Sequence, residues 1–414
     1  MSKRRVVVTG LGALTPIGNT ATEYWQGLMN GVSGAAPITR FDASKFKTQF
    51  ACEVKNFDIG SFIDRKEARK MDPFCHYAVV TSDEAMADSG LKVGDYDPTK
   101  FGVILGSGIG GLLTFQEEVR DFYRGDGTPR FNPFFIPKMI IDIASGHVSI
   151  KYGLRGPNYS TVSACATSSN CIADAFMLIR NGIADLMLAG GSEAAVVEAG
   201  IGGFNAMKAL STRNDDPSTA SRPFDVDRDG FVLGEGGGVL VLEEYEHAKA
   251  RGARIYGELC GVGLTADAYH ITAPHPDGDG AHGVMKQCLD MAGILPSEVD
   301  YVNVHGTSTP LGDIAETKAI KRLFGDHAHK LNISSTKSMT GHLLGAAGAI
   351  EAIASVLSIY HGVVPPTINH FTDDPECDLN YTFHTPVKRD VRVAISNTFG
   401  FGGHNASVVF RKLD

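Results

Sequence analysis

The feature that most constrains the fold is an alternation of short β-branched runs with longer segments of helical periodicity. The β-branched runs predict strands at residues 5–10, 101–106, 184–191, 237–243, 255–263, 299–306, 391–397 and 405–412. Apolar residues at helical spacing predict helices at residues 168–184, 283–294 and 345–362. Strands that alternate with helices favour an α/β fold, and near-continuous apolar runs favour buried, largely parallel strands.

Two similar stretches indicate a duplication. VVVTGLGALT begins at Val6 and GELCGVGLTAD at Gly257, and both run from an apolar strand into Gly-x-Gly and a small polar segment. Self-similarity of this kind is the signature of repeated structural units. We therefore expect two halves, residues 1–253 and residues 254–414. No low-complexity linker separates them, so they should pack as one unit.

Composition limits the class of protein. With 414 residues, of which 43% are apolar and 21% charged, the chain can bury a large core. A net charge of −9 argues against a general nucleic-acid binder. The first apolar run is short, and no stretch approaches the ~18 to 20 continuous apolar residues of a membrane helix, so we expect a cytoplasmic protein without a membrane partner. Seven scattered cysteines without a C-x-x-C pair indicate neither a disulfide framework nor a structural zinc site.

Two motifs imitate ligand-binding loops. GSGIGG at residues 106–111 matches the glycine pattern of dinucleotide-binding loops, but a segment rich in Pro and Phe follows where a second strand is required. DVDRDGFVLGEG at residues 225–236 resembles a calcium loop, but its last position holds Gly236 instead of a bidentate glutamate. We expect neither a nicotinamide or flavin cofactor nor a calcium ion at these two motifs.

Cys165 lies among small side chains in NYSTVSACATSSNC, where a packing cysteine would have large apolar neighbours. Small neighbours indicate either that another backbone packs tightly against this segment or that a substrate must reach the sulfur. A helix is predicted to begin close to Cys165, and the unpaired amides at a helix start lower a thiol pKa from its free value of about 8.5. Cys165 is therefore a candidate nucleophile, whereas Cys171 falls inside the helix and is expected in the core.

Two of the fourteen histidines stand where a fold can hold a catalytic group. His305 ends the predicted strand at residues 299–306, and His342 lies where a loop becomes a helix. Residues in such places can be held toward a shared cleft. Together with Cys165 they predict acyl transfer through a thioester, without separating a hydrolase from a synthase.

Four segments resemble the signature segments of the β-ketoacyl-acyl carrier protein synthases, in the same order: GPNYSTVSACATSSN, VNVHGTSTPLGD, STKSMTGHLLGAAGAIEA and SNTFGFGG. The similarity covers essentially the whole chain and is greatest to the elongating type II group of bacterial fatty acid synthesis. The resemblance implies a homodimer with a thiolase fold, in which duplicated α/β halves pack as a five-layer αβαβα sandwich. It implies decarboxylative Claisen condensation of acyl-acyl carrier protein with malonyl-acyl carrier protein to 3-oxoacyl-acyl carrier protein.

The resemblance also implies catalytic roles. Cys165 matches the nucleophile that takes the acyl chain from its carrier protein, and His305 and His342 match the pair that assists decarboxylation of the malonyl group. Uncharged imidazole N–H donors would stabilise the enolate that remains after loss of carbon dioxide. Lys337 matches an active-site lysine with an electrostatic or organising role. Phe401 matches the gate residue whose backbone N–H forms an oxyanion hole with that of Cys165.

Substrate contacts are implied at further positions. The hydroxyls of Thr272, Thr307 and Thr309 match those that hold the pantetheine arm. Matches to the acyl pocket and gate are Ile109, Phe204, Phe399 and, contributed across the dimer, Phe135 and Ile136. No cofactor is required for catalysis, since the substrates arrive on the phosphopantetheine of acyl carrier protein.

Lys66, Arg69 and Lys70 are spaced to place three positive charges on one face of a short helix. In the family, the acidic carrier protein docks on such a patch, joined here by Arg130 and Lys208. The alternative is an ordinary solvated helix face. The resemblance also implies a structural monovalent or divalent cation near Asn303, Glu351, Ser396 and Asn397.

The sequence leaves alternatives open. A stand-alone ketosynthase of polyketide chain extension would share every catalytic residue, and GSGIGG formally allows an oxidoreductase. Cys165 argues against a non-enzymatic chain-length subunit, and His342 argues against priming synthases and chalcone-type enzymes, which have Asn there. A thiolase would need a second cysteine in the glycine-rich loop. His404 stands where the family usually has Thr. The effect of this difference on the motion of the glycine-rich loop is left open by the sequence.

Overall fold

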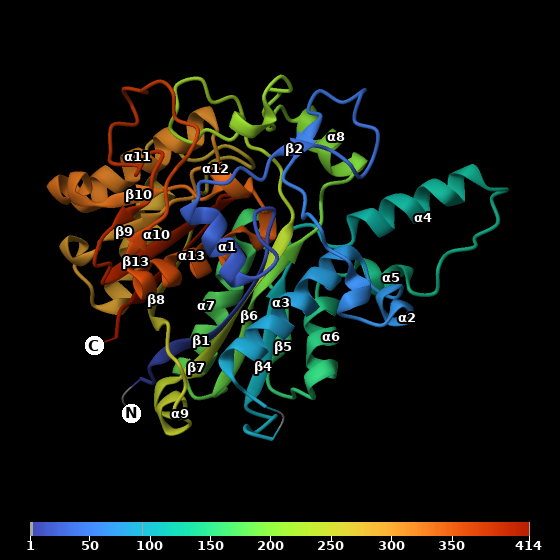
Figure 1. Ribbon diagram of the computed structural model, residues 1–414, viewed down its shortest axis with the longest axis horizontal. Coiled ribbons are helices and arrows are strands. Elements are labelled where there is room, and N and C mark those ends of the chain that lie inside the picture. Colours follow the sequence, from blue (N-terminus) through green and yellow to red (C-terminus); the bar gives the residue numbers. More distant parts are fainter. Residues whose placement is uncertain (1–2, 93, 414) are drawn as a thin grey trace.

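The computed structural model describes residues 3–92 and 94–413, and a ten-stranded sheet runs through it (Figure 1). In pairing order the strands are β10 (Asn332–Ser334), β9 (Tyr301–Asn303), β13 (Val393–Gly400), β14 (His404–Arg411), β8 (Gly257–Ala266), β1 (Val6–Leu14), β7 (Gly236–Glu244), β6 (Leu186–Glu193), β4 (Phe101–Gly106) and β5 (Asn158–Tyr159). All eight predicted strands are therefore confirmed. The short β5 and β10 lack a strong apolar run and were not predicted.

The sheet is mixed, so the prediction of largely parallel strands was wrong. The parallel pairs are β4 with β5, β4 with β6, β9 with β13 and β9 with β10, and the remaining pairs are antiparallel. Only Phe401, Gly402 and Gly403 join β13 to β14, and the two glycines have φ of 89° and 73°. Because a parallel connection needs a crossover of a dozen or more residues, this short turn forces an antiparallel pair.

The strand order repeats. Within this sheet, the first five strands in sequence, β1 and β4 to β7, lie in the order β1-β7-β6-β4-β5, and the last five lie in the order β8-β14-β13-β9-β10. Numbered within each set, both orders read 1-5-4-2-3. The two stretches with similar sequences form β1 and β8, the first strand of each set, and these two strands pair with each other. The division at residues 253 and 254 falls between α9 (Tyr245–Ala250) and β8 and stays a prediction.

Helices cover both faces of the two strand sets and fill the space between them. The central layer consists of α7 (Thr167–Arg180) and α13 (Ala347–His361), which contact strands of both sets. The outer layers contain α3 (Pro73–Ser89) with α6 (Ile143–Tyr152), and α10 (Asp279–Ala292) with α11 (Pro310–Phe324) (Figure 1). The arrangement is the five-layer thiolase-like fold.

One segment, Leu344–His361, is long and apolar enough to cross a membrane by length and mean composition, although it is not a continuous apolar run. It is 89% buried inside the fold, and it contains the core helix α13. Its apolar character on all sides is that of a helix packed between two sheets.

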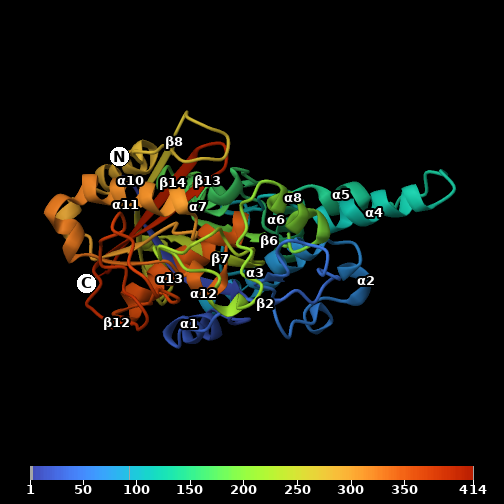
Figure 2. The same ribbon diagram turned by 90° about the horizontal axis from the view of Figure 1, so that it is seen from above.

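The remaining elements lie outside the layers. They are α1 (Ala21–Met29), α2 (Arg65–Ala68), α4 (Leu112–Arg124), α5 (Phe135–Met139), α8 (Glu198–Ala206), α12 (Lys337–Thr340) and two small two-stranded sheets, β2 (Ala36–Pro37) with β3 (Phe50–Ala51) and β11 (Val363–Val364) with β12 (Val387–Lys388). In Figures 1 and 2, α4 projects away from the body. Several large apolar side chains on α4 and the nearby α5 are exposed, including Tyr123 at 80% and Ile136 at 54%.

Candidate active site

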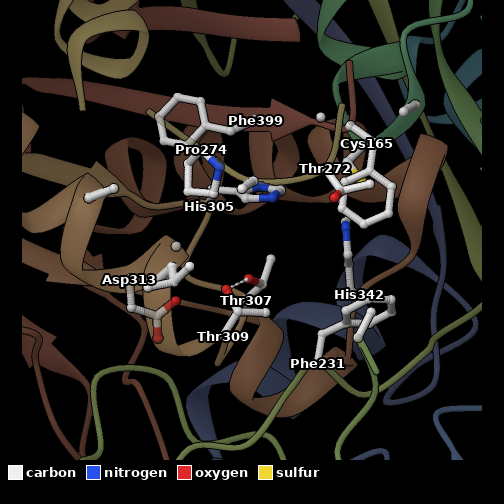
Figure 3. A pocket seen from close by; sticks show the side chains of 18 of the residues that line it. Cys165, Phe231, Thr272, Pro274, His305, Thr307, Thr309, Asp313, His342 and Phe399 are labelled. Atoms are coloured by element: carbon white, nitrogen blue, oxygen red, sulfur yellow. Dashed lines mark hydrogen bonds between the residues drawn. The ribbon is translucent and has the colours of Figure 1, made fainter. Parts of the chain in front are cut away.

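A cavity of about 660 Å³ opens between the two strand sets (Figure 3). Its wall includes Cys165, His305 and His342, which lie far apart in the sequence. A concave site of this size, with few polar groups among apolar ones, is typical of a small-molecule site. The structure thus brings together the three groups that the sequence singled out.

A strained turn places Cys165 at the start of α7. The preceding residue, Ala164, has φ of 51°, which is uncommon for a residue other than glycine. Thr167 stabilises the turn, since its hydroxyl accepts from the Ser163 N–H at 2.9 Å and donates to the Ala164 carbonyl at 2.7 Å. A Cβ at Gly400 would lie 2.6 Å from the Ser163 carbonyl oxygen and 3.1 Å from the Cys165 nitrogen, so only glycine allows the end of β13 to approach this closely.

The pKa of the Cys165 thiol is raised to about 12, because burial disfavours the thiolate. The charge of Lys337 and the backbone N–H groups of Phe401 and Cys165 act in the opposite direction but do not outweigh burial. The backbone N–H at the helix start thus acts in the predicted direction, but the prediction of a net pKa below the free value was wrong. The same contacts place two N–H donors at the sulfur, where they can also hold an oxyanion.

The rings of His305 and His342 lie next to each other, edge to face, on the cavity wall that also contains Cys165 (Figure 3). Their ring centroids lie 5.3 Å apart and their planes meet at 88°. Burial and the charge of Lys337 hold the pKa of both imidazoles well below the usual value. His305 Nδ1 and both ring nitrogens of His342 have no hydrogen-bond partner among the residues that the structure describes. Two uncharged imidazoles are thus free to donate or accept at the cavity.

Different backbone contacts position the two histidines. The carboxylate of Glu316 accepts from the N–H groups of His305 and Gly306, each at 2.9 Å. His342 pairs with the segment before β7, since its N–H donates to the Val232 carbonyl at 2.7 Å and its carbonyl accepts from the Gly234 N–H at 2.9 Å. Glu316 was missed in the sequence, where it lies on a helix with other charged residues.

Glu193 is a second buried carboxylate that the sequence analysis missed. At the end of β6, it accepts from the Ser107 hydroxyl at 2.8 Å and from the N–H groups of Gly108, Ile109 and Gly345 at 2.7, 3.2 and 3.0 Å. The amides of the GSGIGG loop are therefore occupied by a protein carboxylate rather than free for a phosphate. A single acidic residue among small and apolar ones, in AGGSEAAVV, was the available signal.

Lys337 does not line the cavity. It is 1% exposed, and its ammonium pairs with the carboxylate of Glu351 behind the histidines. Its effect at the site is electrostatic, because its charge lowers the pKa of His305, His342 and the Cys165 thiol.

The other predicted contact residues divide into two groups. The cavity wall includes Thr272, Thr307, Thr309, Ile109, Phe204, Phe399, Phe401 and Lys208. The hydroxyl oxygens of Thr307 and Thr309 form a hydrogen bond with each other at 3.0 Å (Figure 3). Phe135 and Ile136 lie on α5 and do not line this cavity.

The predicted basic patch is less regular than expected. Only Lys66 lies inside α2, because the helix ends at Ala68 and Arg69 is its C-cap. Lys70 pairs with Glu67 at 2.7 Å. Arg130 is exposed in the segment before α5, 3.8 Å from Asp126. The expectation of three charges on one helical face was therefore wrong, although all three residues lie at one end of α2.

The predicted cation position contains buried oxygen atoms without partners. Asn303 Oδ1, Glu351 Oε2 and Ser396 Oγ have no hydrogen-bond partner among the described residues, and Asn303 and Ser396 are paired neighbours in β9 and β13. Oxygen donors of this kind fit a hard cation. The Asn397 side chain is engaged elsewhere, since its Oδ1 accepts from Ser407 at 2.7 Å. Within the described ranges, no three or more His, Cys, Asp or Glu side chains cluster as metal ligands.

Several relatives are similar to this chain over its full length. The chain is 54% identical over 412 residues to the 3-oxoacyl-[acyl-carrier-protein] synthase 2 of Synechocystis sp., with 100% of this chain and 99% of the relative covered. Proteins of the same name in Staphylococcus aureus and Coxiella burnetii are 52% and 51% identical, with 99% or more of each chain covered.

Solved structures share the fold. A type II PKS acyl-carrier protein in complex with its ketosynthase matches with a TM-score of 0.92 at 37% identity, covering 99% of this chain and 100% of that one. The ishigamide ketosynthase/chain length factor matches with a TM-score of 0.93 at 36% identity, with both chains fully covered. Family models for the β-ketoacyl synthase N-terminal and C-terminal domains match residues 3–248 and 256–371. The chain, with its buried cysteine and paired histidines, belongs to the β-ketoacyl synthase family.

Proposed function

We propose that this protein is an elongating 3-oxoacyl-[acyl-carrier-protein] synthase of fatty acid synthesis, which condenses a carrier-bound acyl group with malonyl-acyl carrier protein. One observation carries the proposal: a thiol and two uncharged imidazoles share one cavity, in a chain whose full-length relatives bear this name. Acyl transfer requires a nucleophile, and decarboxylation requires donors for an enolate oxygen. The cavity offers both.

In the first half-reaction, the Cys165 sulfur attacks the acyl thioester carbon. A carbon–sulfur bond forms to Cys165, and the bond to the pantetheine sulfur breaks. Because the thiol pKa is about 12, its proton must leave as the new bond forms, and the departing pantetheine thiolate takes up one proton. The N–H groups of Cys165 and Phe401 would hold the oxyanion.

In the second half-reaction, the malonyl thioester loses carbon dioxide. The electron pair of the broken carbon–carbon bond forms an enolate, whose oxygen would accept N–H bonds from His305 and His342. The enolate carbon attacks the acyl carbon on Cys165, and the Cys165 thiolate leaves and takes up a proton. The hydroxyls of Thr307 and Thr309, on the same wall, would hold the pantetheine arm.

Two further features belong to the proposal. We expect a cytoplasmic homodimer, in which Phe135 and Ile136 reach the partner's acyl pocket; the exposed apolar side chains near the projecting α4 and α5 support this. We also expect a structural cation held by Asn303, Glu351 and Ser396, which would lock β9 to β13 behind the histidines. Catalysis itself would need no cofactor.

Product analysis tests the function. Purified protein, malonyl-acyl carrier protein and saturated acyl-carrier substrates of stated length should give one 3-oxoacyl product per carbon dioxide released. Release of free fatty acid instead would indicate a hydrolase. Repeated extension without reduction of the keto group would favour the alternative of polyketide synthesis, to which the solved ketosynthase structures relate.

A further inference from the structure

Glu193 connects two segments of the active site that lie far apart in the sequence. Its Oε1 accepts from the Ser107 hydroxyl at 2.8 Å and from the Ile109 N–H at 3.2 Å, both in the loop after β4. Its Oε2 accepts from the Gly108 N–H of the same loop at 2.7 Å and from the Gly345 N–H at 3.0 Å. Gly345 belongs to the short turn that leads into α13. One carboxylate therefore bridges the loop after β4 and the turn before α13.

Both segments form part of the catalytic cavity. Ile109 of the loop and Leu344 of the turn line its wall. His342, which lines the same wall, lies two residues before Leu344 in the chain (Figure 3). Glu193 itself is fully buried and is not part of the wall. Its carboxylate thus contacts no substrate, but it holds the backbone at Ile109 and the backbone close to His342.

The two segments are also packed backbone to backbone. A Cβ at Gly345 would lie 2.1 Å from the Gly108 nitrogen. A Cβ at Gly108 would lie 2.8 Å from the Glu193 Oε2 and 3.4 Å from the Ala164 carbonyl oxygen. Glycine at both positions is therefore required for so close an approach. Because Ala164 directly precedes Cys165, this junction also adjoins the turn that carries the nucleophile.

The turn before α13 is strained in the same way as the turn before α7. Leu344 has φ of 46° and Ala164 has φ of 51°, and each is the first residue of a three-residue turn directly before a core helix. Such a backbone conformation persists only where surrounding contacts hold it. The hydrogen bond from Gly345 to Glu193 is one of these contacts.

We propose that Glu193 is a positioning residue for condensation, which keeps the cavity wall at Ile109 in register with the donor His342. The inference rests on the function proposed above, because condensation is the step that uses the acyl chain and the histidines together. A displacement of about 1 Å far from the chemistry can cost about a hundredfold in rate. A buried carboxylate that bridges both segments can therefore govern the rate without touching a substrate.

Glu193→Gln tests this role with almost no change in side-chain size. Three of the four donors are backbone N–H groups, which cannot accept, so the amide NH2 group must leave at least one of them without an acceptor. Condensation should fall about ten- to a hundredfold, as expected for a small displacement of a reacting group. Acylation of Cys165, followed by intact-protein mass, should fall less than about threefold, because it does not use His342.

Glu243→Gln is the matched control for loss of stability. Glu243 is also fully buried, lies on the neighbouring strand β7, and accepts from Thr9 and Arg251 at 2.7 Å each. It is not part of the cavity wall. Melting temperatures should fall in both variants, whereas the ratio of the acylation rate to the condensation rate should change only in Glu193→Gln.

A double-variant cycle with Ile109→Phe gives a readout that lost stability alone would not produce. The larger side chain should exclude long acyl chains because Glu193 prevents the loop from moving aside. The measured quantity is kcat/KM for a long acyl-carrier substrate divided by kcat/KM for a short one, since this ratio cancels any equal loss with both. In the Glu193→Gln background, Ile109→Phe should lower the ratio at least about threefold less than it does alone.

Ser107→Ala keeps the cycle informative if Glu193→Gln does not fold. This change removes one donor from Oε1 and should also weaken the effect of Ile109→Phe on the ratio. Additive behaviour in the cycle, or equal loss of acylation and condensation in Glu193→Gln, would overturn the positioning role and leave the proposed function standing. If wild type forms no 3-oxoacyl product, the proposed function is wrong and the positioning role is wrong with it.

Discussion

At the scale of single residues, the thiol of Cys165 is held in its neutral form. Burial raises its pKa to about 12, although Lys337 and two backbone N–H groups favour the thiolate. The thiolate is the species that reacts with alkylating agents and oxidants. In the free enzyme the nucleophile should therefore be protected, and it should lose its proton only as a thioester carbonyl arrives.

The pH dependence of alkylation measures this effect. Between about pH 7 and about pH 9.5, the rate of modification of Cys165 by iodoacetamide should rise about tenfold per pH unit without a plateau, because the thiolate fraction grows throughout this range below a pKa of about 12. Peptide mass mapping separates Cys165 from the other six cysteines, and Cys165→Ala gives the background. A plateau near pH 8 would mean that the helix start, rather than burial, controls the thiol.

The paired histidines should act mainly in the second half-reaction. His305→Ala and His342→Ala should each lower condensation about a hundred- to a thousandfold, the usual cost of one oxyanion donor. Acylation of Cys165, followed by intact-protein mass, should fall much less. His329→Ala, at an exposed position outside the cavity, is the control. Equal loss of acylation in both variants would assign one histidine to thiol activation instead.

At the scale of elements, the loop after β4 is fixed by one buried carboxylate. Glu193 accepts from the backbone N–H groups of Gly108 and Ile109 and from the Ser107 hydroxyl. The loop therefore cannot easily retreat when a larger side chain is introduced on the cavity wall. This rigidity makes Ile109 a position from which the length of the acyl chain can be limited.

Enlarging Ile109 should shorten the accepted substrates. We expect Ile109→Phe to lower the condensation of long acyl chains at least about tenfold and to leave the condensation of short chains nearly unaffected. The loop that carries this residue is held by hydrogen bonds, so it cannot easily move aside for a larger side chain. The measurement is kcat/KM over a series of acyl-carrier substrates, with the smaller change Ile109→Val as control. Unaltered use of long chains by Ile109→Phe would place the acyl pocket elsewhere.

At the scale of the whole molecule, this net-negative protein must bind a carrier protein that is also negatively charged. The chain carries a net charge of −9, so binding of an acidic carrier protein depends on local positive surface. Changing Lys66, Arg69 and Lys70 to Glu should raise KM for acyl-carrier substrates at low salt and weaken the dependence of KM on ionic strength. Screening over about 8 to 10 Å makes the wild-type advantage fade as salt rises.

A small substrate and a matched variant complete this test. Turnover of an acyl-pantetheine, which needs no protein surface, reports whether the catalytic cavity is intact in the triple variant. Reversal of three exposed lysines elsewhere should leave KM for the carrier substrate unchanged: Lys92, Lys330 and Lys388. If the triple variant uses carrier substrates as well as wild type does at low salt, these residues form only a solvated surface.

The sequence by itself determined the features that depend only on short stretches of neighbouring residues. Eight strands and the three predicted helices follow from residue period and β-branching, and each has a counterpart in the structure. Cys165, His305 and His342 were recognisable because small neighbours, a strand end and a helix start are also local signals. Their motifs, in order along the chain, were sufficient to identify the family.

Only the tertiary structure decided what depends on contacts between distant segments. The strand directions follow from which strands become neighbours, and the pKa of the Cys165 thiol follows from burial by many segments at once. Glu193 and Glu316 gain their role only when folding brings backbone N–H groups of other segments to their carboxylates. Propensity and periodicity act over a few residues, whereas desolvation and charge act through space, and for that reason the sequence located the reacting groups but not the environment that governs them.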